Sequence, residues 1–366
     1  MRERRITAAV LVSFLLSGGT RVALAQDEPT VPVVHALMFG DADYLATTRK
    51  LLPAGFSLGQ LVGHVNASLT DRLTLFGEVS ATAQQASYAI EVERSILRYD
   101  FSDEFKLSAG RFHTPIGYWN TAFHHGAWLQ TTIARPEEIK FGSQLLPTHF
   151  VGVFAEGSLA TNALGLGYQV GVGNGRGSTI SRAGDAGDVN GNRAWTVALS
   201  ARPVALPGTQ IGAAYYHDRV SPVTTPGAGE GTTSAYVAWE PGQAEAIAEY
   251  AGIRHSPLAG GTTTMNHAYY AQLAYRLSGV ARAWKPYARA ERITTDAADV
   301  IFAPLLLGYE GFTGGVRYDF APYAALKSEV RRERLQNAGW SSALAFQATF
   351  TVPDLFSTGD RPVTHQ

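Results

Sequence analysis

Residues 109–150 read AGRFHTPIGYWNTAFHHGAWLQTTIARPEEIKFGSQLLPTHF, and this stretch interrupts an otherwise regular chain. On both sides of it, short segments alternate apolar and polar residues. The alternation stops after Phe112 and resumes near Phe150. A stretch of this length without a secondary-structure pattern is uncommon inside a compact domain and usually carries function. The flanking segments therefore decide the fold, and the interruption is the first candidate for a functional site.

The flanking segments have the period-two pattern of strands with one apolar face. In residues 56–69, for example, Leu61 and Val65 alternate with Gln60 and His64. Such segments, about ten residues long and separated by turns, are typical of an all-β transmembrane antiparallel barrel, whose strands have one face toward lipid and one toward the lumen. We predict about sixteen strands, at residues 33–46, 56–69, 73–83, 88–101, 105–112, 150–157, 164–174, 195–202, 210–218, 234–240, 244–255, 267–277, 284–294, 309–320, 324–334 and 340–352.

The turns between these segments alternate in length. They are mostly short after even-numbered segments and longer and more polar after the others. An even strand count with this alternation places both chain ends on the periplasmic side of an outer-membrane barrel. The segment at 88–101 alternates badly at Glu93-Arg94-Ser95, which indicates a β-bulge or an error of register. The alternative fold, a soluble β-sandwich, would need apolar inner faces on both of its sheets.

Aromatic residues gather near the ends of the predicted strands. Amphipathic rings at strand ends are typical of the two interfaces of a membrane barrel. The predicted periplasmic ends carry Phe101, Trp239, Tyr275, Trp284, Phe320 and Phe350. The predicted outer ends carry Tyr44, Trp195, Tyr269 and Trp340.

The N-terminus has the order of a secretory signal. Charged residues 1–5 precede an apolar run from Ile6 to Leu16, and small residues end at Ala25. We therefore predict a signal peptide at 1–25, a barrel at 26–352 and a C-terminal tail at 353–366. The apolar run is too short to cross a bilayer, and no later run approaches 18 residues.

Composition limits the remaining classes. The chain has 0 cysteines, which excludes disulfides, thiol catalysis and cysteine metal sites. Removing residues 1–25 takes four arginines and Glu3 from 30 basic and 31 acidic residues, which leaves a net charge of −4. That balance does not fit a nucleic-acid-binding protein. Only 17% of residues are charged, below the roughly 25% of ordinary soluble domains, as expected of a barrel with a lipid face.

The late strands predict a charged wall on the lumenal face. Mixed charges in a water-filled lumen set a field that filters ions and small solutes. The alternative is a salt-bridged ladder that only keeps the lumen wet and the barrel stiff. The predicted lumen-lining residues are Lys285, Arg289, Glu291, Arg317, Asp319, Lys327, Glu329 and Arg331, accompanied by Glu245, Glu249, Arg276 and Glu333. Arg332 and Arg334 would lie near the outer rim, at headgroup level or in solvent.

The interrupting stretch would be the third outer loop. If it points into the barrel, Arg135, Glu137, Glu138 and Lys140 form a pore constriction opposite the charged wall. The alternative is a surface lid or a small subdomain.

Few residues suggest chemistry. His124-His125 invites a metal site, but adjacent residues point apart in an extended chain and no third ligand at useful spacing is evident, so no metal is predicted. Asp185, Asp188, Asn190 and Asn192 resemble a calcium loop weakly, and a turn-rich loop is the preferred interpretation. The His-Glu-x-x-His motif of metalloproteases and the phosphate-loop motif are missing from the sequence. We predict no catalytic residues and no cofactor.

Residues 110–117, GRFHTPIG, resemble a run that phosphate-selective porins O and P and their relatives carry where this strand enters the third loop. LRYDF at 97–101 and VGVGNG at 170–175 are similar to that group as well. The resemblance implies a sixteen-stranded channel that is usually a homotrimer. It does not carry over phosphate selectivity, because Ile116 replaces the usual Phe and two glutamates dilute the charge of the loop.

The leading hypothesis is a bacterial outer-membrane porin, a passive channel for small hydrophilic solutes or ions, with anions such as phosphate among the candidates. Its partners would be outer-membrane lipid, lipopolysaccharide and the permeating solutes. A closed barrel acting as a surface receptor or structural anchor is the alternative, and packing of Trp119, Phe123 and Trp128 across the whole bore would favour it. An enzyme with a Ser/His pairing across loops is a third hypothesis.

Overall fold

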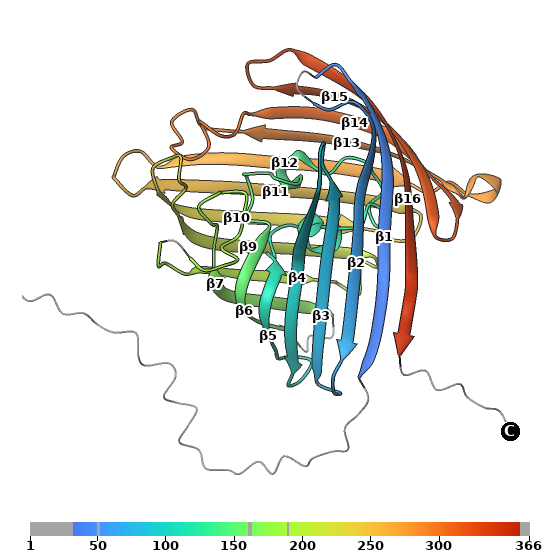
Figure 1. Ribbon diagram of the computed structural model, residues 1–366, viewed down its shortest axis with the longest axis horizontal. Helices are drawn as coiled ribbons and strands as arrows, with labels where there is room; N and C mark the ends of the chain where they lie inside the picture. Colours follow the sequence, from blue (N-terminus) through green and yellow to red (C-terminus); the bar gives the residue numbers. More distant parts are fainter. Residues whose placement is uncertain (1–31, 50–51, 160–162, 189, 359–366) are drawn as a thin grey trace, which may run out of the picture. The chain divides into compact units, whose positions relative to one another are not determined.

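A computed structural model describes residues 32–49, 52–159, 163–188 and 190–358 of the chain. Sixteen antiparallel strands pair in sequence order, and β16 pairs with β1 to close the barrel (Figure 1). This confirms the predicted fold class. The strands are β1 Val33–Thr47, β2 Gly55–Ser68, β3 Leu73–Ala83, β4 Tyr88–Asp100, β5 Lys106–His113, β6 His149–Ser158, β7 Leu166–Asn174, β8 Ala194–Ala201, β9 Thr209–Val220, β10 Ala228–Trp239, β11 Ala244–Pro257, β12 Thr264–Tyr275, β13 Trp284–Thr294, β14 Tyr309–Ala321, β15 Ala324–Leu335 and β16 Trp340–Thr358.

The last strand differs from its predicted end at Val352. It continues to Thr358 and pairs with the start of β1, with Ala36 opposite Phe356. A register shift between Ala36 and Met38 accommodates the interruption after Val352, where Pro353 cannot donate to the ladder. The predicted tail therefore begins later than residue 353. The predicted signal peptide at 1–25 lies outside the described residues, as do residues 359–366.

Alternation along each strand sorts the side chains into an apolar outer face and a polar inner face. On β12, Leu273 is 63% exposed while its neighbour Gln272 is 1% exposed. On β11, Tyr250 is exposed and Glu249 is buried. A soluble protein has the opposite arrangement, so this distribution is that of a barrel whose outer face meets lipid.

The irregularity predicted at Glu93 is a β-bulge. Glu78 of β3 pairs with Arg94 and Val79 pairs with Val92, so Glu93 has no partner across the ladder. A bulge turns one extra side chain out of the regular alternation. Here Glu93 and Arg94 both contact lumenal groups, since Glu93 accepts from Ser80 and Arg94 donates to Glu78.

Part of the predicted aromatic set lies at strand ends. Trp195, Trp239, Trp284 and Trp340 do so, and each is at least 38% exposed. Tyr269 instead lies in the middle of β12, and Phe350 lies inside β16 because that strand continues to Thr358. The guanidinium groups of Arg332 and Arg334 lie 5.5 and 5.0 Å from the Trp340 ring centre, within cation–π range.

Within residues 32–358, apart from the few positions not described there, helical structure is confined to short turns. α1 spans Tyr118–Ala122, and two 3₁₀ turns, η1 and η2, span Glu137–Ile139 and Gly279–Ala281. In the described part of the chain, none of the helices has both the length and the hydropathy that a membrane span requires.

Candidate functional site

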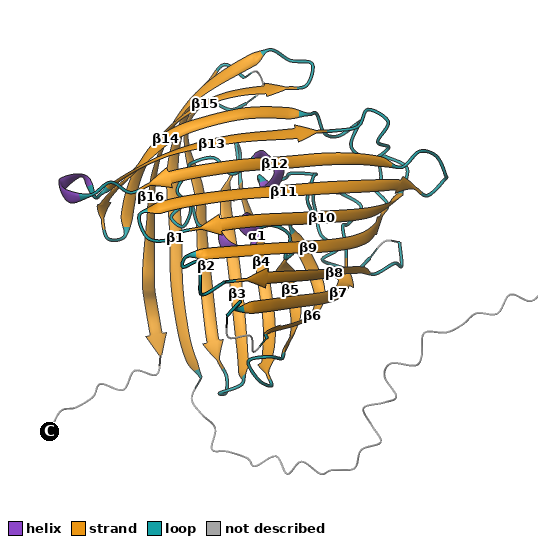
Figure 2. Ribbon diagram, turned by 180° about the vertical axis from the view of Figure 1, so that it is seen from behind, coloured by secondary structure: helices purple, strands orange, loops and turns teal. Residues whose placement is uncertain are grey.

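The third loop on the long-loop side, residues 114–148 and here named L3, folds into the barrel. Figure 2 shows α1, which belongs to L3, inside the ring of strands. L3 leaves β5 at His113 and returns at His149, and these two residues are directly opposite each other in the β5–β6 ladder. The predicted inward position of the loop is therefore observed.

The start of L3 depends on Gly117. Its φ is +76°, and a Cβ there would lie 2.2 Å from Oε2 of Glu249 on β11. The absent side chain lets the backbone N–H groups of Tyr118 and Trp119 donate to the Glu249 carboxylate, at 2.7 and 2.8 Å. Glu249 thus satisfies orphan donors in the first turn of α1, whose positive end favours a carboxylate.

Carboxylates of the charged wall hold the middle of L3 through its backbone N–H groups. Glu329 of β15 accepts from Ile133 at 2.9 Å and from Ala134 at 3.2 Å. Glu291 of β13 accepts from the N–H of Glu137 at 2.6 Å. These are charge-assisted hydrogen bonds, which are stronger than neutral ones.

Basic residues of the same wall hold L3 through its carbonyls. Lys327 donates to the carbonyls of Ala127, Gln130 and Thr132 at 2.5–3.1 Å. Arg317 donates to Trp128 and Gln130 and lies over the Trp128 ring. In the same way Arg289 donates to the carbonyls of Ala134 and Arg135.

These contacts change the predicted role of the lumen-lining residues. They do face inward, but Arg289, Lys327 and Glu329 are at most 3% exposed and therefore are not hydrated charges in open water. Most of their hydrogen-bonding capacity goes to L3. Alternation along a strand predicts only the direction of a side chain, so it could not foresee that a loop would cover it. The remaining members pair nearby: Lys285 with Glu245, Arg317 and Arg276 with Asp319, Arg331 with Glu329, and Arg49 with Glu333.

The four residues predicted to form the constriction lie in different surroundings. Arg135 donates to the carbonyls of Ile139 and His124 and stacks on Phe141 at 4.0 Å. Glu138 is 4% exposed. Glu137 and Lys140 form an ion pair in which the Lys140 side chain is 41% exposed and that of Glu137 is 14% exposed. Of the four, Lys140 is the most accessible to solvent.

Burial also shifts the titration of these L3 groups. It lowers the pKa of Arg135 to about 9, against the opposing attraction of Glu93. Burial raises the pKa of Glu138 well above its ordinary value, and the nearby carboxylates of Glu249 and Glu291 raise it further.

Apolar residues of L3 pack against one side of the barrel interior. Trp119 is 1% exposed and meets Phe123 and Tyr270 edge to face. Ile116, Ile139 and Leu145 are buried in the same cluster. Two further loops contribute, since Ile180 comes from residues 175–193 and Phe302 from residues 295–308. The three loops together fill the space beside β9–β14.

A buried ionic network joins these loops to the wall. His255 of β11 lies between Asp299 and Glu230, at 2.8 and 3.0 Å. Arg176 pairs with Glu230 at 3.0 Å and donates to the carbonyls of Gln144 and Leu145 in L3. Strand alternation predicts only that residues 175–193 and 295–308 lie outside the strands, so the sequence did not indicate this network.

A polar cavity lies between the other side of L3 and the strands β2–β7, toward the short-turn end of the barrel. Its volume is about 590 Å³. Arg94 and Arg98 of β4 contribute positive charge, although they pair with Glu78 and Asp100. The cavity is lined by Asn66, Ser68, Thr74, Phe76, Arg94, Ile96, Arg98, Ser108, Phe112, His113, Thr121, Glu156 and Gln169. We name this space the vestibule.

Four histidines meet at the edge of the vestibule. His113 and His149 end the strands that flank L3, and His124 and His125 follow α1. The expectation that no third ligand lies near His124-His125 is wrong. The chain there is not extended, and the strand pairing of His113 with His149 brings two more rings to the same place. The sequence signal was present, since one histidine stands at each end of the loop.

The turn-rich interpretation of the acidic 185–192 segment agrees with its contacts. Asp188 and Asn190 each accept a backbone N–H two residues further on, as in Asx turns. Asp185 instead pairs with Arg111 of β5 at 2.7 Å.

Solved structures of outer-membrane proteins share the fold of this closed sixteen-stranded barrel. An anion-selective porin from Comamonas acidovorans has a TM-score of 0.64 at 9% identity, covering 88% of this chain and 100% of that one. OmpT of Vibrio cholerae in its trimer form has a TM-score of 0.59 at 13% identity, covering 88% and 100%. The outer membrane channel DcaP of Acinetobacter baumannii has 0.56 at 10%, covering 87% and 97%. No protein-family model and no curated protein sequence matches the chain.

Proposed function

We propose that the chain is a bacterial outer-membrane porin, a passive diffusion channel for small hydrophilic solutes or ions. The observation that carries the proposal is L3, which enters the lumen and is held there by buried charged residues of β11–β15. A loop fixed inside a barrel narrows the bore without blocking it. Here the loop is held by hydrogen bonds to charged side chains of the strands. The fold of the solved neighbours supports the same function.

The constriction we propose includes fewer residues than the four that the sequence predicted. Glu138 is buried, and the partly buried Arg135 donates to carbonyls of L3 itself, so both act on loop packing. Lys140, with Glu137 beside it, retains contact with solvent and is the group that a passing ion would meet.

An anion preference is part of the proposal. Arg94 and Arg98 line the vestibule, and each remains partly exposed, at 25% and 37% of its side chain. One structural neighbour is titled an anion-selective porin. Phosphate is one candidate among small anions.

Planar-bilayer recording of the refolded full chain tests the proposal. We expect stepwise conductance and a reversal potential that Lys140→Ala shifts toward cations. Arg135→Ala is the matched comparison, because its guanidinium donates to carbonyls of L3 and its loss should alter stability more than selectivity. A barrel that stays silent at high protein load would overturn the channel function.

One observation favours a second function, a closed barrel that serves as a surface receptor or anchor. L3 buries Trp119 with apolar residues of two other loops beside β9–β14. On the opposite side Gly126 approaches the Phe39 ring of β1. Folded barrels that bind detergent, show native circular dichroism and yet pass no current would support this function over the channel.

A homotrimer in the outer membrane, in contact with lipid and lipopolysaccharide, completes the proposal. It is motivated by the apolar outer face and by the trimer form of one neighbour. Chemical cross-linking of the detergent-extracted protein tests it, and a single monomer band at every cross-linker concentration would contradict it.

A further inference from the structure

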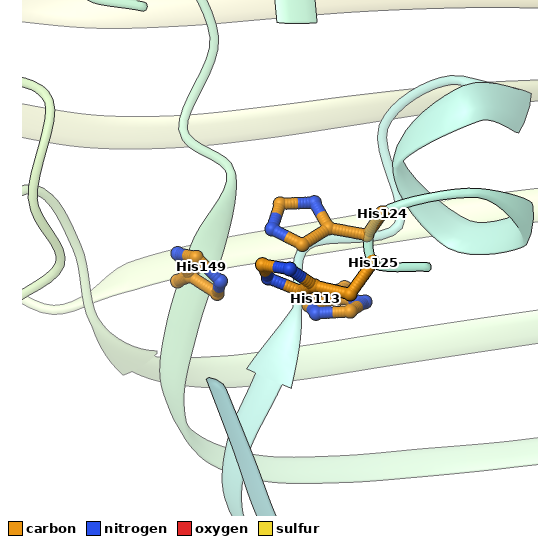
Figure 3. A group of neighbouring side chains, drawn as sticks. All are labelled: His113, His124, His125 and His149. Atoms are coloured by element: carbon orange, nitrogen blue, oxygen red, sulfur yellow. The ribbon is translucent and has the colours of Figure 1, made fainter. Parts of the chain in front are cut away.

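The four histidines at the base of L3 form a compact cluster (Figure 3). One ring nitrogen from each of His113, His124, His125 and His149 lies within 4.8 Å of the others. Nitrogens around a tetrahedral ion with bonds of about 2.0–2.1 Å stand roughly 3.4 Å apart. Small side-chain rotations of the two loop histidines would therefore bring the four rings to coordinating distance.

The four rings are at most 11% exposed. His124 and His125 are 3% and 4% exposed, and the side chains of His113 and His149 are 5% and 11% exposed. None of the four Nε2 atoms makes a well-formed hydrogen bond to a residue that the structure describes, although those of His125 and His149 lie 3.1 Å from the Glu93 carboxylate. Native proteins leave few buried nitrogens without a hydrogen bond, and several in one place indicate a ligand that they share.

The other ring nitrogens already have partners that orient two of the rings. Nδ1 of His124 lies 2.6 Å from Oδ1 of Asn120, and Nδ1 of His125 lies 3.3 Å from Oε1 of Gln60. The Asn120 amide nitrogen donates to two carbonyls, which fixes its oxygen toward His124. An amide oxygen can only accept, so His124 carries its proton on Nδ1 and presents the Nε2 lone pair to the cluster. Metal-binding histidines are oriented in this way.

A carboxylate completes the site. The β-bulge in β4 turns Glu93 toward the cluster, where its Oε2 lies 3.1 Å from Nε2 of His125 and of His149. Glu93 is 3% exposed, and its other oxygen accepts from Ser80 at 2.6 Å. Arg111 also approaches Glu93 Oε2, at 3.6 Å, and limits the net negative charge. Bulges that re-aim one side chain are common beside functional sites.

We propose that His113, His124, His125 and His149 bind one divalent transition-metal ion, and that the Glu93 carboxylate beside them balances part of its charge. Imidazole nitrogens with one carboxylate suit Zn²⁺, Cu²⁺ or Ni²⁺ and not Mg²⁺ or Ca²⁺, which prefer oxygen ligands. The ion reaches the site from the vestibule, which His113 lines.

The bound ion would also fix the side of L3 that faces β5 and β6. The charged residues of β11–β15 hold L3 on one side of the lumen, and the ion would join its His124-His125 segment to β5 and β6 on the other. An effect of the ion on conductance rests on the proposed channel function, whereas binding itself does not.

Metal binding is measured on the folded full chain, stripped of metal by chelator, by calorimetric titration with Zn²⁺ and by the visible absorption of bound Co²⁺. We expect one ion per chain, an increase in thermal stability on Zn²⁺ addition, and tetrahedral Co²⁺ bands. His124→Gln and His149→Gln should each weaken Zn²⁺ binding by at least tenfold, and Asn120→Ala by about tenfold through loss of ring orientation. His267→Gln, on β12 and outside the cluster, is the matched control.

Two results would overturn the site. One is an unaltered melting temperature of the wild-type barrel in excess Zn²⁺, a test that needs no variant. The other is equal Zn²⁺ affinity in wild type and in His124→Gln that retains native circular dichroism. Zn²⁺ binding with no change in conductance would leave the metal site standing and count against L3 as the constriction.

Discussion

The two sides of the barrel interior have similar polar residues and opposite environments. On the packed side, β9–β15, the inward charges are covered by L3 and two other loops, and Lys327 and Glu329 bind the loop backbone. On the vestibule side, β2–β7, Arg94 pairs with Glu78 across the β3–β4 ladder and Arg98 pairs with Asp100 on its own strand, and both arginines keep contact with a cavity. The difference shows that an inward-pointing side chain is not necessarily hydrated. Its hydration depends on whether a loop covers it inside the barrel.

The largest effect on stability and conductance is expected from a substitution that releases L3 from the packed side. Lys327→Met removes the donor of three enclosed L3 carbonyls. Loss of a buried charged partner costs on the order of 3 kcal/mol or more. We expect a lower free energy of unfolding in urea and a conductance that is larger and noisier, because L3 leaves the wall.

The control for Lys327→Met is Arg332→Gln on the same strand. Arg332 faces the rim, donates to Ser342 and makes no contact with L3. Equal conductance in wild type and Lys327→Met would mean that the packed side does not hold the loop.

Gly117→Ala should have the next largest effect, by separating L3 from Glu249. Both Gly117 and Gly142 have positive φ, at +76° and +70°, so an added Cβ strains each by about 1–2 kcal/mol. Only at Gly117 does the Cβ also meet a carboxylate oxygen, at 2.2 Å; at Gly142 no described atom lies within 4 Å. We expect Gly117→Ala to destabilise the barrel by about 1–3 kcal/mol more than Gly142→Ala, measured by urea unfolding.

Equal losses at the two glycines would contradict this account. They would show that backbone strain alone matters and that the close approach of α1 to Glu249 contributes nothing.

The sequence predicted the barrel well and the interior poorly, for a physical reason. Period-two alternation and turn phase are local properties of each strand, so the strand number and the bulge at Glu93 followed from them. The partners of Lys327 lie about 200 residues away in sequence, and no local pattern encodes that contact. The same holds for the histidines, whose meeting depends on the closure of β5 against β6. L3 was located correctly, but no local pattern indicated that the Arg135 guanidinium donates to carbonyls of the loop itself.

A smaller effect is expected from pH on the packed side. The pKa of Glu138 is raised well above its unfolded value of about 4.3, because burial and two nearby carboxylates disfavour the anion. The folded chain therefore binds this proton more tightly than the unfolded chain. Its contribution to stability is present below about pH 4.3 and is lost as pH rises through the folded-state pKa, by at most about 1.4 kcal/mol per pH unit.

The free energy of unfolding in urea, measured from about pH 4.5 to about pH 8, gives this pH dependence. We expect Glu138→Gln to remove part of the fall in stability toward high pH, whereas Glu310→Gln, at the rim, should leave it unchanged. Parallel pH profiles of wild type and Glu138→Gln would exclude Glu138 as the titrating group.

The smallest effect is expected on the vestibule side, where water screens the charges. Arg98→Gln removes one partly exposed positive charge from the cavity. We expect a shift of the reversal potential toward cations of a few millivolts in a KCl gradient, with little change in conductance. The shift should be larger near 0.1 M salt than near 1 M, because the Debye length falls from about 10 Å to about 3 Å. Arg289→Gln on the packed side should show the reverse order, a larger loss of stability and a smaller change of selectivity, since its guanidinium is bound to L3 carbonyls. Selectivity that follows Arg289 and not Arg98 would place the ion path on the other side of L3.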